Sequence, residues 1–394
     1  MKILFLANRV PFPPYRGDKL KIFNLAKRLK DRHELHLLTF AQTKEDLGYK
    51  TELEKIFTQV HLVYLPKWKS AINCLPGLWD ATPFQVLYFK SDELQHKLDE
   101  LLKSKNYDAV HVQHLRMSPY LSQRKDISRI LDLPDAFSLY WERRKLVKRG
   151  LAVKLFENIE QHRVLKYEQV LKEYDLSLVC SVEDLDYLAR THKASNLRLL
   201  PNGVDLETFA PRGHDYTHSK TILFTGNMDY APNVDAVNYF AETILRIIRS
   251  KIADVKFVIA GQKPVQKVTA LANEYITVTG FVKDLAATYN SASVVVAPLR
   301  FGAGTQNKVL EAMAMGVPVV CSHIGFGGLG IKSGEGAIMQ TDPVAFANSV
   351  IELLESEALR RRVGQEGMNV ARNKFDWDII AKTLEGYFEE IKKH

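Results

Sequence analysis

Short apolar runs alternate with amphipathic helical patterns along both halves of the chain. A strand that is buried on both faces is apolar throughout, so this alternation is typical of parallel sheets covered by helices. We therefore predict an α/β fold with two doubly wound domains that face a central cleft at the carboxyl ends of their strands. The strands that we expect are residues 3–8, 35–40, 61–65, 109–113, 129–133, 176–181 and 197–200 in the first half, and residues 221–225, 256–260, 276–279, 294–298, 318–322 and 337–340 in the second.

The composition agrees with two globular domains. The chain has 394 residues, of which 46% are hydrophobic and 25% are charged, which is enough for two separate cores. Residues 211–220 are polar and rich in turn-forming residues, so we place the domain boundary near them. The N-terminal apolar run is too short for a signal peptide, and no stretch has the roughly 18 apolar residues of a membrane span.

Cysteine and charge restrict the setting of the protein. Cys74, Cys180 and Cys321 lie far apart in apolar segments, which predicts a reducing cytoplasm and neither a disulfide framework nor a metal cluster. Residues 1–200 carry 34 Lys and Arg against 25 Asp and Glu, whereas the remainder carries 20 against 21. The net positive charge therefore lies in the first half.

The segment from Arg300 to Cys321 contains the clearest chemical signal. A glycine-rich loop runs into a short helical pattern, a Gly-Val-Pro turn and a buried strand. Gly302 and Gly304 have no Cβ to keep a ligand away from the backbone, and we expect Thr305 to cap the helix that begins there. Backbone N–H groups and the positive end of the helix dipole would then meet at one point, which suits a diphosphate.

Lys308 and Glu311 project from the same face of this helix because they are three residues apart. The cation would bind phosphate, and the carboxylate one turn further would accept hydrogen bonds from ribose hydroxyl groups. A lone pair of this kind is more often an ordinary surface ion pair. The glycine loop before it and the buried strand after it favour the nucleotide interpretation instead.

This stretch resembles the nucleotide-sugar site of the GT-B glycosyltransferases of the large retaining family 4, the group 1 glycosyl transferases. The family site ends in E-A-M-A-x-G-x-P-V-V, which corresponds to residues 311–320. Two further segments agree in order and spacing: P-N-G-V-D at residues 201–205, with Phe209 and Pro211 following, and F-T-G at residues 224–226. The resemblance covers essentially the whole chain, and within the family it is similar to bacterial exopolysaccharide sugar transferases.

The resemblance implies a GT-B fold of two Rossmann-like domains. Residues 1–205 would bind the acceptor, residues 206–375 would bind the nucleotide-sugar donor, and the C-terminal helix within residues 376–394 would return to the first domain. The expected catalytic residues are His114, Lys308 and Glu311. The expected donor contacts are Gly17, Gly226, Asn227, Phe281, Val282, Gly304, Thr305, Gln306, Asn307, Lys308 and Glu311.

Two features of the first half would serve the acceptor and the donor sugar. The loop P-F-P-P-Y-R-G at residues 11–17 leads into an amphipathic helix, and we expect Arg16, Asp18 and Lys19 to contact the acceptor; a plain strand-to-helix turn is the alternative. Family members carry H-x-H at the end of a later strand, with a histidine that contacts the donor sugar, whereas this chain has His111-Val-Gln-His114. We assign that role to His114, with a structural histidine as the alternative.

Three positions depart from the family pattern. Ala303 stands where a glutamate contacts donor-sugar hydroxyl groups, so the identity of the sugar is left open. Asn227 stands where an arginine binds the diphosphate, and Asn233 lies near the position of the family's lysine. The cations left to supply this charge are Lys308, Arg300 and Arg16.

Two other motifs are interpreted differently from their usual meaning. G-x-G-x-x-G at residues 325–330 matches the dinucleotide fingerprint, but residues 331–336 lack the helical pattern that would receive a pyrophosphate, so we expect a loop beside the donor sugar. D-x-D occurs at residues 184–186 and 376–378, where helices begin and acidic residues favour the helix dipole. We therefore expect no obligatory metal ion, and no cofactor besides the donor substrate.

Residues 66–79 and 141–156 combine Lys and Arg with Trp, Leu, Val and Phe, as helices at membrane interfaces do. One interpretation is peripheral contact of the N-terminal domain with an anionic membrane. The other is a solvated basic face with aromatic residues turned toward the core. The sequence has no recognised nucleic-acid-binding module, so we expect no nucleic-acid partner.

We predict a retaining, metal-independent hexosyltransferase that moves a sugar from a nucleotide diphosphate to a glycan or polyprenyl-linked acceptor. Bacterial exopolysaccharide or cell-surface polysaccharide synthesis is the expected role, in the cytoplasm, and at the inner face of the cell membrane if the basic segments bind lipid. The alternatives are a noncatalytic partner protein that binds a sugar nucleotide, and a sugar-nucleotide epimerase.

Overall fold

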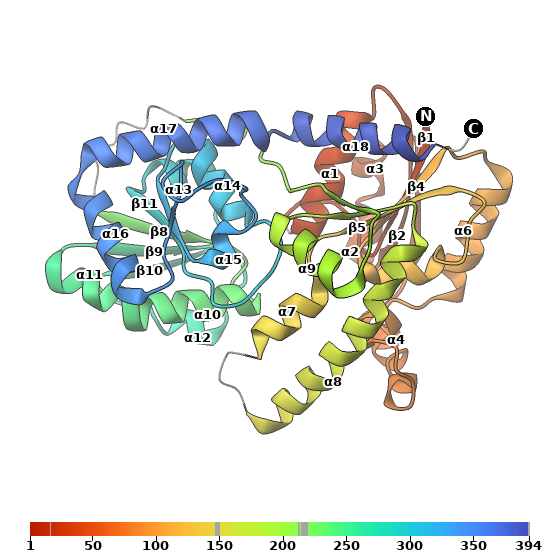
Figure 1. Cartoon of the computed structure of the whole chain (residues 1–394), viewed down its shortest axis with the longest axis horizontal. Coiled ribbons are helices and arrows are strands. Elements are labelled where there is room, and N and C mark those ends of the chain that lie inside the picture. Colours follow the sequence, from red (N-terminus) through yellow and green to blue (C-terminus); the bar gives the residue numbers. More distant parts are fainter. Residues whose placement is uncertain (16, 146–149, 212, 214–219, 393–394) are drawn as a thin grey trace. The chain divides into compact units, whose positions relative to one another are not determined.

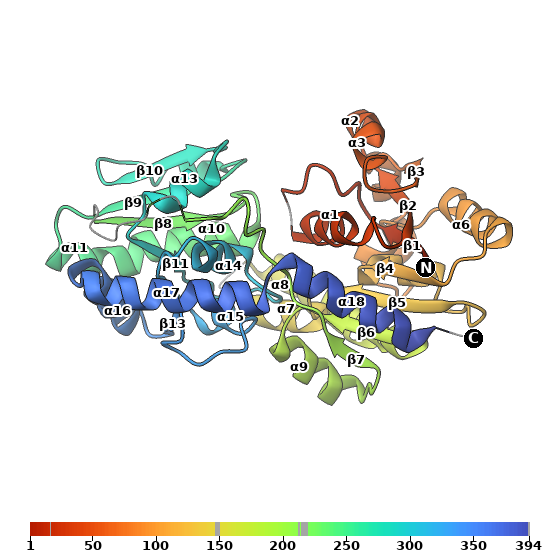
Figure 2. The same ribbon diagram turned by 90° about the horizontal axis from the view of Figure 1, so that it is seen from above.

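The computed structural model describes residues 1–394 except residues 16, 146–149, 212, 214–219 and 393–394 (Figure 1). The chain forms two compact units. Unit 1 comprises Met1–Pro201 and Ile380–His394, and unit 2 comprises Asn202–Ile379. Helices cover both faces of a parallel sheet in each unit (Figures 1 and 2), so the predicted pair of doubly wound α/β domains is confirmed.

Unit 1 contains a parallel sheet in the order β3-β2-β1-β4-β5-β6-β7. Its strands are β1 (Lys2–Ala7), β2 (Glu34–Ala41), β3 (Gln59–Tyr64), β4 (Ala109–Gln113), β5 (Ser128–Leu133), β6 (Leu176–Val179) and β7 (Leu197–Leu199). Its helices are α1 (Gly17–Leu29), α2 (Lys44–Gly48), α3 (Lys50–Leu53), α4 (Lys67–Ile72), α5 (Phe84–Leu87), α6 (Asp92–Ser104), α7 (Phe137–Arg144), α8 (Leu151–Tyr167) and α9 (Val182–His192), with the 3₁₀ turns η1 (Leu75–Leu78), η2 (Leu115–Tyr120) and η3 (Glu168–Glu173).

Unit 2 contains a second parallel sheet, in the order β10-β9-β8-β11-β12-β13. Its strands are β8 (Thr221–Thr225), β9 (Lys256–Ala260), β10 (Ile276–Gly280), β11 (Val294–Ala297), β12 (Val319–Cys321) and β13 (Ile338–Met339). Its helices are α10 (Ala231–Tyr239), the π-helical turn η4 (Phe240–Ile244), α11 (Leu245–Lys251), α12 (Gln266–Thr269), α13 (Leu285–Asn290), α14 (Asn307–Ala314), α15 (His323–Phe326), α16 (Pro343–Glu355) and α17 (Glu357–Lys374).

Every strand expected from an apolar run is present, with bounds that differ by at most a few residues. The central strands are buried along their length: β5 and β11 have no exposed position. Because burial on both faces removes the in-and-out alternation of a half-exposed strand, continuous apolar runs were the correct signal.

The last helix, α18 (Trp377–Ile391), contributes most of its length to unit 1. Glu385 accepts hydrogen bonds from Arg32 at 2.9 Å and lies 2.6 Å from His33 Nε2. The Ser128 hydroxyl donates to the Ile391 carbonyl at 2.7 Å, and the Tyr387 hydroxyl donates to the Leu199 carbonyl at 2.9 Å. The end of the chain therefore completes a sheet-covering layer that begins at residue 17.

A buried ion pair ties α1 to the sheet of unit 1. Lys21 and Asp132 are both about 1% exposed, and Lys21 Nζ donates to Asp132 Oδ1 at 2.6 Å and to the Leu200 carbonyl at 2.9 Å. Burial, the largest single cause, would lower the pKa of Lys21, but the charges of Asp132 and Cys180 and the hydrogen bonds to both together outweigh burial and raise it. Asp132 also lies 3.3 Å from His111 Nε2, so three elements meet at this carboxylate.

We predict that Asp132→Ala destabilises unit 1 by about 3–5 kcal/mol, because it leaves the Lys21 ammonium buried without its counter-ion. Urea unfolding measures this loss. The double variant Lys21→Met with Asp132→Ala should recover most of it, since neither charge of this pair is then left buried without its partner. Glu100→Gln, which breaks the exposed pair between Lys97 and Glu100, is the control and should change little; an Asp132→Ala effect as small as this control would contradict the prediction.

Candidate functional site

The strand order of unit 2 reverses between β8 and β11. The chain moves outward from β8 to β9 and β10, then returns to β11 on the other side of β8. The loops that leave the carboxyl ends of such neighbouring strands diverge, and ligands of doubly wound sheets bind in the space between them. Gly226 and Asn227 follow β8, and residues 298–306 lead from β11 into α14. The fold thus brings most of the predicted donor-binding residues to one edge of one sheet.

The glycine loop ends in a helix that begins later than predicted. Gly302 and Gly304 have φ angles of 142° and 71°, values that favour glycine. Helix α14 begins at Asn307, and its N-cap is Gln306, which makes no side-chain capping bond. The prediction that Thr305 caps the helix is therefore wrong. Thr305 is instead buried where Gly328 approaches it: a Cβ on Gly328 would lie 3.0 Å from the Thr305 Cα.

Lys308 lies in the first turn of α14 and is only 7% exposed. Its Nζ donates to Asn233 Oδ1 at 3.2 Å and to Gln306 Oε1 at 3.3 Å, and lies 5.2 Å from the centre of the Phe224 ring. Within the described part of the chain, the hydrogen-bond partners of this ammonium are neutral amides. Its charge is therefore available to an anionic ligand.

Burial lowers the pKa of Lys308 to about 8, and the negative charge of Glu311 only partly offsets burial. An ammonium that is removed from water without a direct counter-ion loses part of its stabilisation, and a bound diphosphate would restore it. The site is thus electrostatically matched to an anion.

Glu311 is held by a buried tyrosine that the sequence analysis did not identify. The Tyr289 hydroxyl donates to Glu311 Oε2 at 2.7 Å and lies 2.6 Å from Thr225 Oγ1. Tyr289, on α13, and Thr225 are buried, whereas Glu311 is half-buried. Burial raises the pKa of Glu311, while the bond from Tyr289 and the charge of Lys308 act in the opposite direction. One carboxylate oxygen is fixed by Tyr289, which orients the other for a ligand hydroxyl.

Asn227 and Asn233 lie where the sequence resemblance would place cations. Gly226 has φ 151°, and a Cβ there would lie 2.6 Å from Asn233 Nδ2, so only glycine allows Asn233 this close. Asn233 Nδ2 donates to the Asn227 carbonyl at 3.0 Å, and Gln262 Nε2 donates to Asn227 Oδ1 at 2.7 Å. These amides form a hydrogen-bonded platform that extends to Lys308 and adds no charge of its own.

Arg300 does not add to the charge at Lys308. Its guanidinium bonds both oxygens of Asp235, at 2.8 and 2.6 Å, and stacks 4.7 Å from the centre of the Tyr239 ring. Its charge is therefore compensated by Asp235. Arg16, the other cation considered, lies outside the described residues.

The remaining donor candidates of unit 2 are placed as follows. Asn307 Oδ1 accepts a hydrogen bond at 2.9 Å from Asn202, which belongs to the P-N-G-V-D segment. Gln306 Nε2 donates to the Ala303 carbonyl at 3.3 Å. Phe281 is 59% exposed and Val282 half-buried after β10, at the same edge of the sheet but two strands from β8. That these two residues border a base stays a prediction.

The alternative motifs have local structural explanations. Residues 323–326 of the G-x-G-x-x-G region form the four-residue helix α15, whose N-cap is Ser322 rather than a glycine turn. Asp184 lies in the first turn of α9, and Asp376 Oδ1 accepts from the Asp378 N–H where α18 begins. Among the described residues, no group of three or more His, Cys, Asp or Glu is arranged to hold a metal ion.

In unit 1 the strand order reverses between β1 and β4, and the predicted acceptor residues lie beside that point. Gly17, Asp18 and Lys19 form the first turn of α1. The Asp18 carboxylate lies 3.5 Å from Arg9 Nη1. The backbone carbonyl of Asp18 accepts a hydrogen bond from Gln113 Nε2 at 2.6 Å. The start of α1 and the end of β4 are thus joined. That these residues bind an acceptor stays a prediction.

His114 follows β4 in a rare backbone conformation, with φ 82°. Such a conformation costs a non-glycine residue about 1–3 kcal/mol and is often found at functional sites. The His114 N–H donates to the Asp132 carbonyl at 2.8 Å, its ring packs 4.5 Å from that of Phe137, and Nδ1 accepts from the Arg116 N–H at 3.3 Å. Burial lowers the pKa of His114 well below its usual value, so the ring is neutral with its proton on Nε2. Its contact with a donor sugar stays a prediction.

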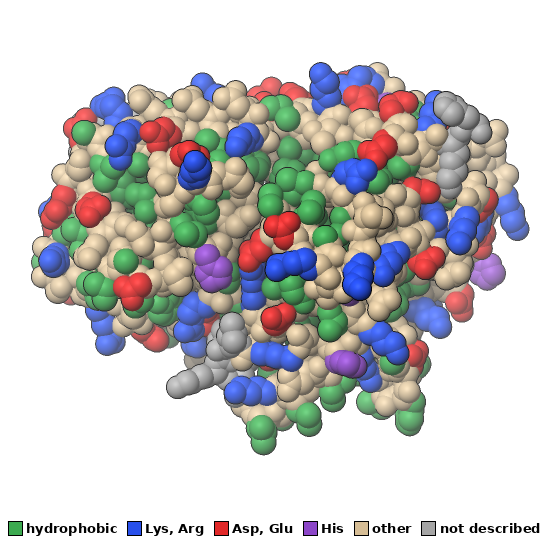
Figure 3. Space-filling model, in the orientation of Figure 1, with side chains coloured by type: hydrophobic (Ala, Val, Ile, Leu, Met, Phe, Trp, Pro, Cys, Tyr) green, Lys and Arg blue, Asp and Glu red, His purple; other side chains and the backbone are tan. Residues whose placement is uncertain are grey.

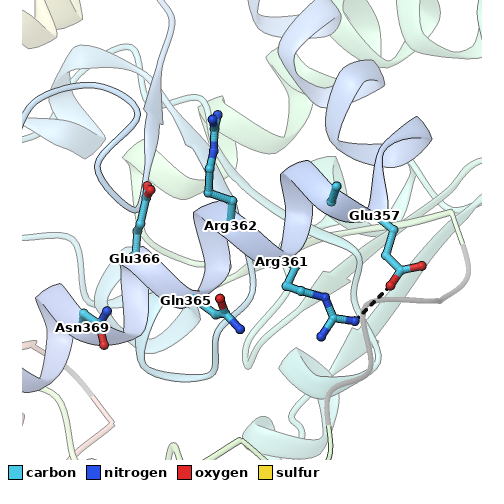
Figure 4. A pocket seen from close by; sticks show the side chains of 7 residues that line it. Glu357, Arg361, Arg362, Gln365, Glu366 and Asn369 are labelled. Carbon is cyan, nitrogen blue, oxygen red and sulfur yellow. Dashed lines mark hydrogen bonds and ion pairs between the residues drawn. The ribbon is translucent and has the colours of Figure 1, made fainter.

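A surface groove of about 620 Å³ lies elsewhere on unit 2, along α17 (Figure 4). A single helix lines it, and the pair between Glu357 and Arg361 at 3.0 Å spans part of it. None of the predicted donor residues takes part, so we assign it no role in nucleotide binding. Its lining residues are Glu357, Ala358, Arg361, Arg362, Gln365, Glu366 and Asn369.

Residues 219–356 match the protein family described as Glycosyl transferases group 1. A phosphatidyl-myo-inositol mannosyltransferase of Mycobacterium tuberculosis is 29% identical over 206 residues, which are 49% of this chain and 53% of the relative. The match thus spans about half the length of such curated relatives. A Klebsiella pneumoniae protein described as an uncharacterized 44.6 kDa protein in the cps region is 22% identical over 95% of this chain and 96% of its own.

The crystal structure of Anabaena Alr3699/HepE in complex with UDP-glucose has the same fold, with a TM-score of 0.71 and 16% identity over 99% of this chain and 100% of its own. With the two parallel sheets, the structural match shows that the chain has the GT-B fold. Within unit 2, residues 219–356 are similar to the group 1 glycosyl transferases.

We predict that nucleoside diphosphate binding weakens above about pH 8. Below that pH the Lys308 side chain of the free protein is protonated. Above it, each further pH unit lowers the affinity about tenfold, up to the pKa of Lys308 in the complex, which the bound anion raises. Calorimetry from pH 6.5 to 9.5 should also show proton uptake on binding in the alkaline range. Lys308→Met should bind weakly without this dependence, and Lys267→Met, at an exposed lysine of unit 2, should behave like wild type. A wild-type profile that stays flat above pH 8 would argue against the role of Lys308.

We predict that Tyr289→Phe weakens donor binding about 10–100-fold, the usual effect of losing a hydrogen bond to a charged group. The bond from Tyr289 lowers the pKa of Glu311, so its loss raises that pKa. When the pH is lowered, the variant should therefore lose donor binding at a higher pH than wild type does. Steady-state kinetics should show the change mainly in KM. Tyr275→Phe, in the same unit, is the matched control; equal effects of both variants would rule out a specific role for Tyr289.

Proposed function

We propose that this protein transfers a sugar from a nucleotide diphosphate to a hydroxyl group of a glycan or lipid-linked acceptor. One observation carries the proposal: Lys308 and Glu311 lie on α14, directly after a glycine loop, at the strand-order reversal of unit 2. The pair is not neutralised as an ordinary ion pair, because Lys308 bonds amides and Glu311 bonds Tyr289. A phosphate-binding cation next to a hydroxyl-binding carboxylate fits a nucleoside diphosphate.

The proposed reaction breaks the bond between the anomeric carbon and the diphosphate, and forms a bond from the acceptor oxygen to that carbon. Negative charge grows on the leaving diphosphate as positive charge grows on the sugar ring. Lys308 and the first N–H groups of α14 would stabilise the leaving group, which is the main task of such a site. The acceptor proton would pass to the departing diphosphate on the same face of the sugar, so that the anomeric configuration is retained.

We further propose that the reaction needs no metal ion. The support is the buried ammonium of Lys308, which supplies a cation where the diphosphate would leave. Lys308 carries this role alone among the described candidate cations, because Arg300 is paired with Asp235. The donor sugar itself is left open by Ala303, whose methyl group can accept no hydrogen bond from a sugar hydroxyl.

The biological role that we propose is assembly of a bacterial exopolysaccharide or other surface polysaccharide, on an acceptor carried by a membrane lipid at the cytoplasmic face. The similarity to a Klebsiella protein of the cps region, and to a mannosyltransferase named for a phosphatidylinositol substrate, supports this setting. No helix among the described residues is long and apolar enough to span a bilayer.

A noncatalytic protein that binds a sugar nucleotide is the second candidate. The replacement of acidic and basic positions by Ala303, Asn227 and Asn233 favours it, because fewer groups are left to distinguish the transition state from the bound donor. The nucleotide-binding geometry alone does not separate the two candidates, whereas turnover does.

We predict that one of the UDP-, GDP-, ADP- or TDP-sugars releases nucleoside diphosphate in the presence of EDTA, and that a lipid-linked acceptor extract increases release. Glu311→Ala should lose binding and turnover, since its carboxylate would hold the ribose. The matched control is Glu357→Ala, which removes an exposed helical carboxylate of unit 2. Binding without release in every mixture would establish the noncatalytic candidate, and conversion of the donor without acceptor would indicate an epimerase.

A further inference from the structure

Unit 1 exposes two groups of large apolar side chains that belong to neighbouring segments. The short helix α4 and turn η1 form one segment, and the first turns of α8 form the other. Trp79 is 84% exposed and Leu151 is 85% exposed, whereas such residues are normally covered. Figure 1 places both segments at the lower edge of unit 1, and Figure 3, in the same orientation, shows hydrophobic side chains at the outer ends of both segments. We name this set the apolar tip: Trp68, Ile72, Leu75, Leu78, Trp79, Leu151, Val153, Leu155, Phe156 and Ile159.

The two parts of the apolar tip are held together by α5. The Phe84 ring stacks on Phe156 with their centres 5.7 Å apart, and Arg163 lies 4.8 Å above the Phe84 ring. Glu160 of α8 accepts from the Phe84 N–H at 3.2 Å and the Gln85 N–H at 3.4 Å. Asn73 donates to the Lys90 carbonyl at 2.8 Å, which ties the loop after α4 to the chain beyond α5. The exposed residues therefore stand on a fixed support.

The charges that accompany the apolar tip are positive on the solvent side. Lys67, Lys69 and Lys154 are exposed between its apolar residues. The carboxylates of α8 are turned inward: Glu157 is 1% exposed and accepts from Arg144 at 2.6 Å, and Glu160 is 2% exposed. Asp80 is an exposed carboxylate at the border of the tip.

The apolar tip has fewer cations available to a membrane than the sequence of residues 141–156 predicted. Arg143 pairs with Glu183, Arg144 with Glu157, and Lys145 bonds Gln161, so these cations serve contacts inside unit 1. Residues 146–149 lie outside the described residues. The cations left at the described part of the tip are the three lysines.

We propose that the apolar tip inserts into the headgroup region of a bilayer that contains anionic phospholipid. Tryptophan, leucine and isoleucine side chains would leave water, while the three lysines would contact lipid phosphates, as in other interfacial segments. A second copy of this chain is a poorer occupant, because a two-fold interface would bring the same lysines face to face. The proposal deepens the proposed function, since it gives the enzyme access to a lipid-carried acceptor.

The test is flotation of the full chain with vesicles of phosphatidylglycerol and phosphatidylethanolamine. Wild type should float with the vesicles. Quadruple replacement by serine at Trp68, Trp79, Leu151 and Leu155 should lower the partition coefficient about 100-fold or more, because apolar area no longer leaves water. Replacement of Lys67, Lys69 and Lys154 by glutamine should lower it by about fivefold per lysine on anionic vesicles only. Val344→Ser, at an exposed apolar residue of unit 2, is the control and should float like wild type.

Tryptophan fluorescence distinguishes insertion from surface adsorption. Of the four tryptophans, Trp377 is fully buried and Trp141 partly buried, so a blue shift and quenching by brominated lipid would report Trp68 and Trp79. The double variant Trp68→Phe with Trp79→Phe should keep binding and lose this signal. Binding without a blue shift, or unchanged flotation of the serine variant, would overturn the proposal, as would a wild-type dimer that ignores vesicles and is lost in the serine variant.

The result of the membrane-binding test can be distinguished from the result of the test of the proposed function. In vesicle-free buffer the serine variant should release nucleoside diphosphate from the donor as wild type does. Glu311→Ala should float normally and release none. Loss of flotation alone therefore concerns the tip, and loss of release alone concerns the donor site.

Discussion

The reversal of strand order within each parallel sheet is the constraint on which the functional geometry depends. In unit 2 it separates the loops after β8 and β11, and the chain places glycines in both: Gly226 in the first, Gly302 and Gly304 in the second. The buried strands beneath cannot shift without breaking their ladders, so each of these loops starts from a fixed position. Chemistry then depends on the few side chains that the two loops and α14 place at this sheet edge.

The sheets were predictable because each strand carries its own evidence. Apolar runs such as residues 294–297 identify a buried strand without knowledge of its neighbours. The partners of side chains carry no such local signal. Arg300 is a candidate phosphate ligand in the sequence, but in the structure it is bound by Asp235, 65 positions earlier. The hydrogen bond from Tyr289 to Glu311 likewise has no local signal in the sequence. The start of α14 was also misjudged, because Thr305 is used for packing against Gly328 rather than as a cap. The family motifs located Lys308 and Glu311, but not the groups that orient them.

The amides around Lys308 have an electrostatic meaning of their own. An arginine at position 227 would stay charged under all conditions, whereas Asn227 and Asn233 offer oriented dipoles and no ionic charge. The ammonium is consequently hydrogen-bonded to protein amides in place of water, and none of the described residues forms an ion pair with it that would compete with a ligand. Such an arrangement favours binding of a multiply charged anion over a weakly charged one, because the multiply charged anion compensates the desolvated cation.

The position of α18 affects the order in which the chain can fold. Unit 2 is continuous from Asn202 to Ile379, but unit 1 is built from both ends of the chain. During synthesis the sheet of unit 1 appears first, yet the bonds that Tyr387 donates to Leu199 and that Ser128 donates to Ile391 form only after this last helix has been made. Unit 2 can therefore finish folding before unit 1 does, against the usual N-to-C order. The part of the first sheet that α18 covers therefore stays exposed while the whole of unit 2 is synthesised, and its apolar surface is accessible to chaperones during that period.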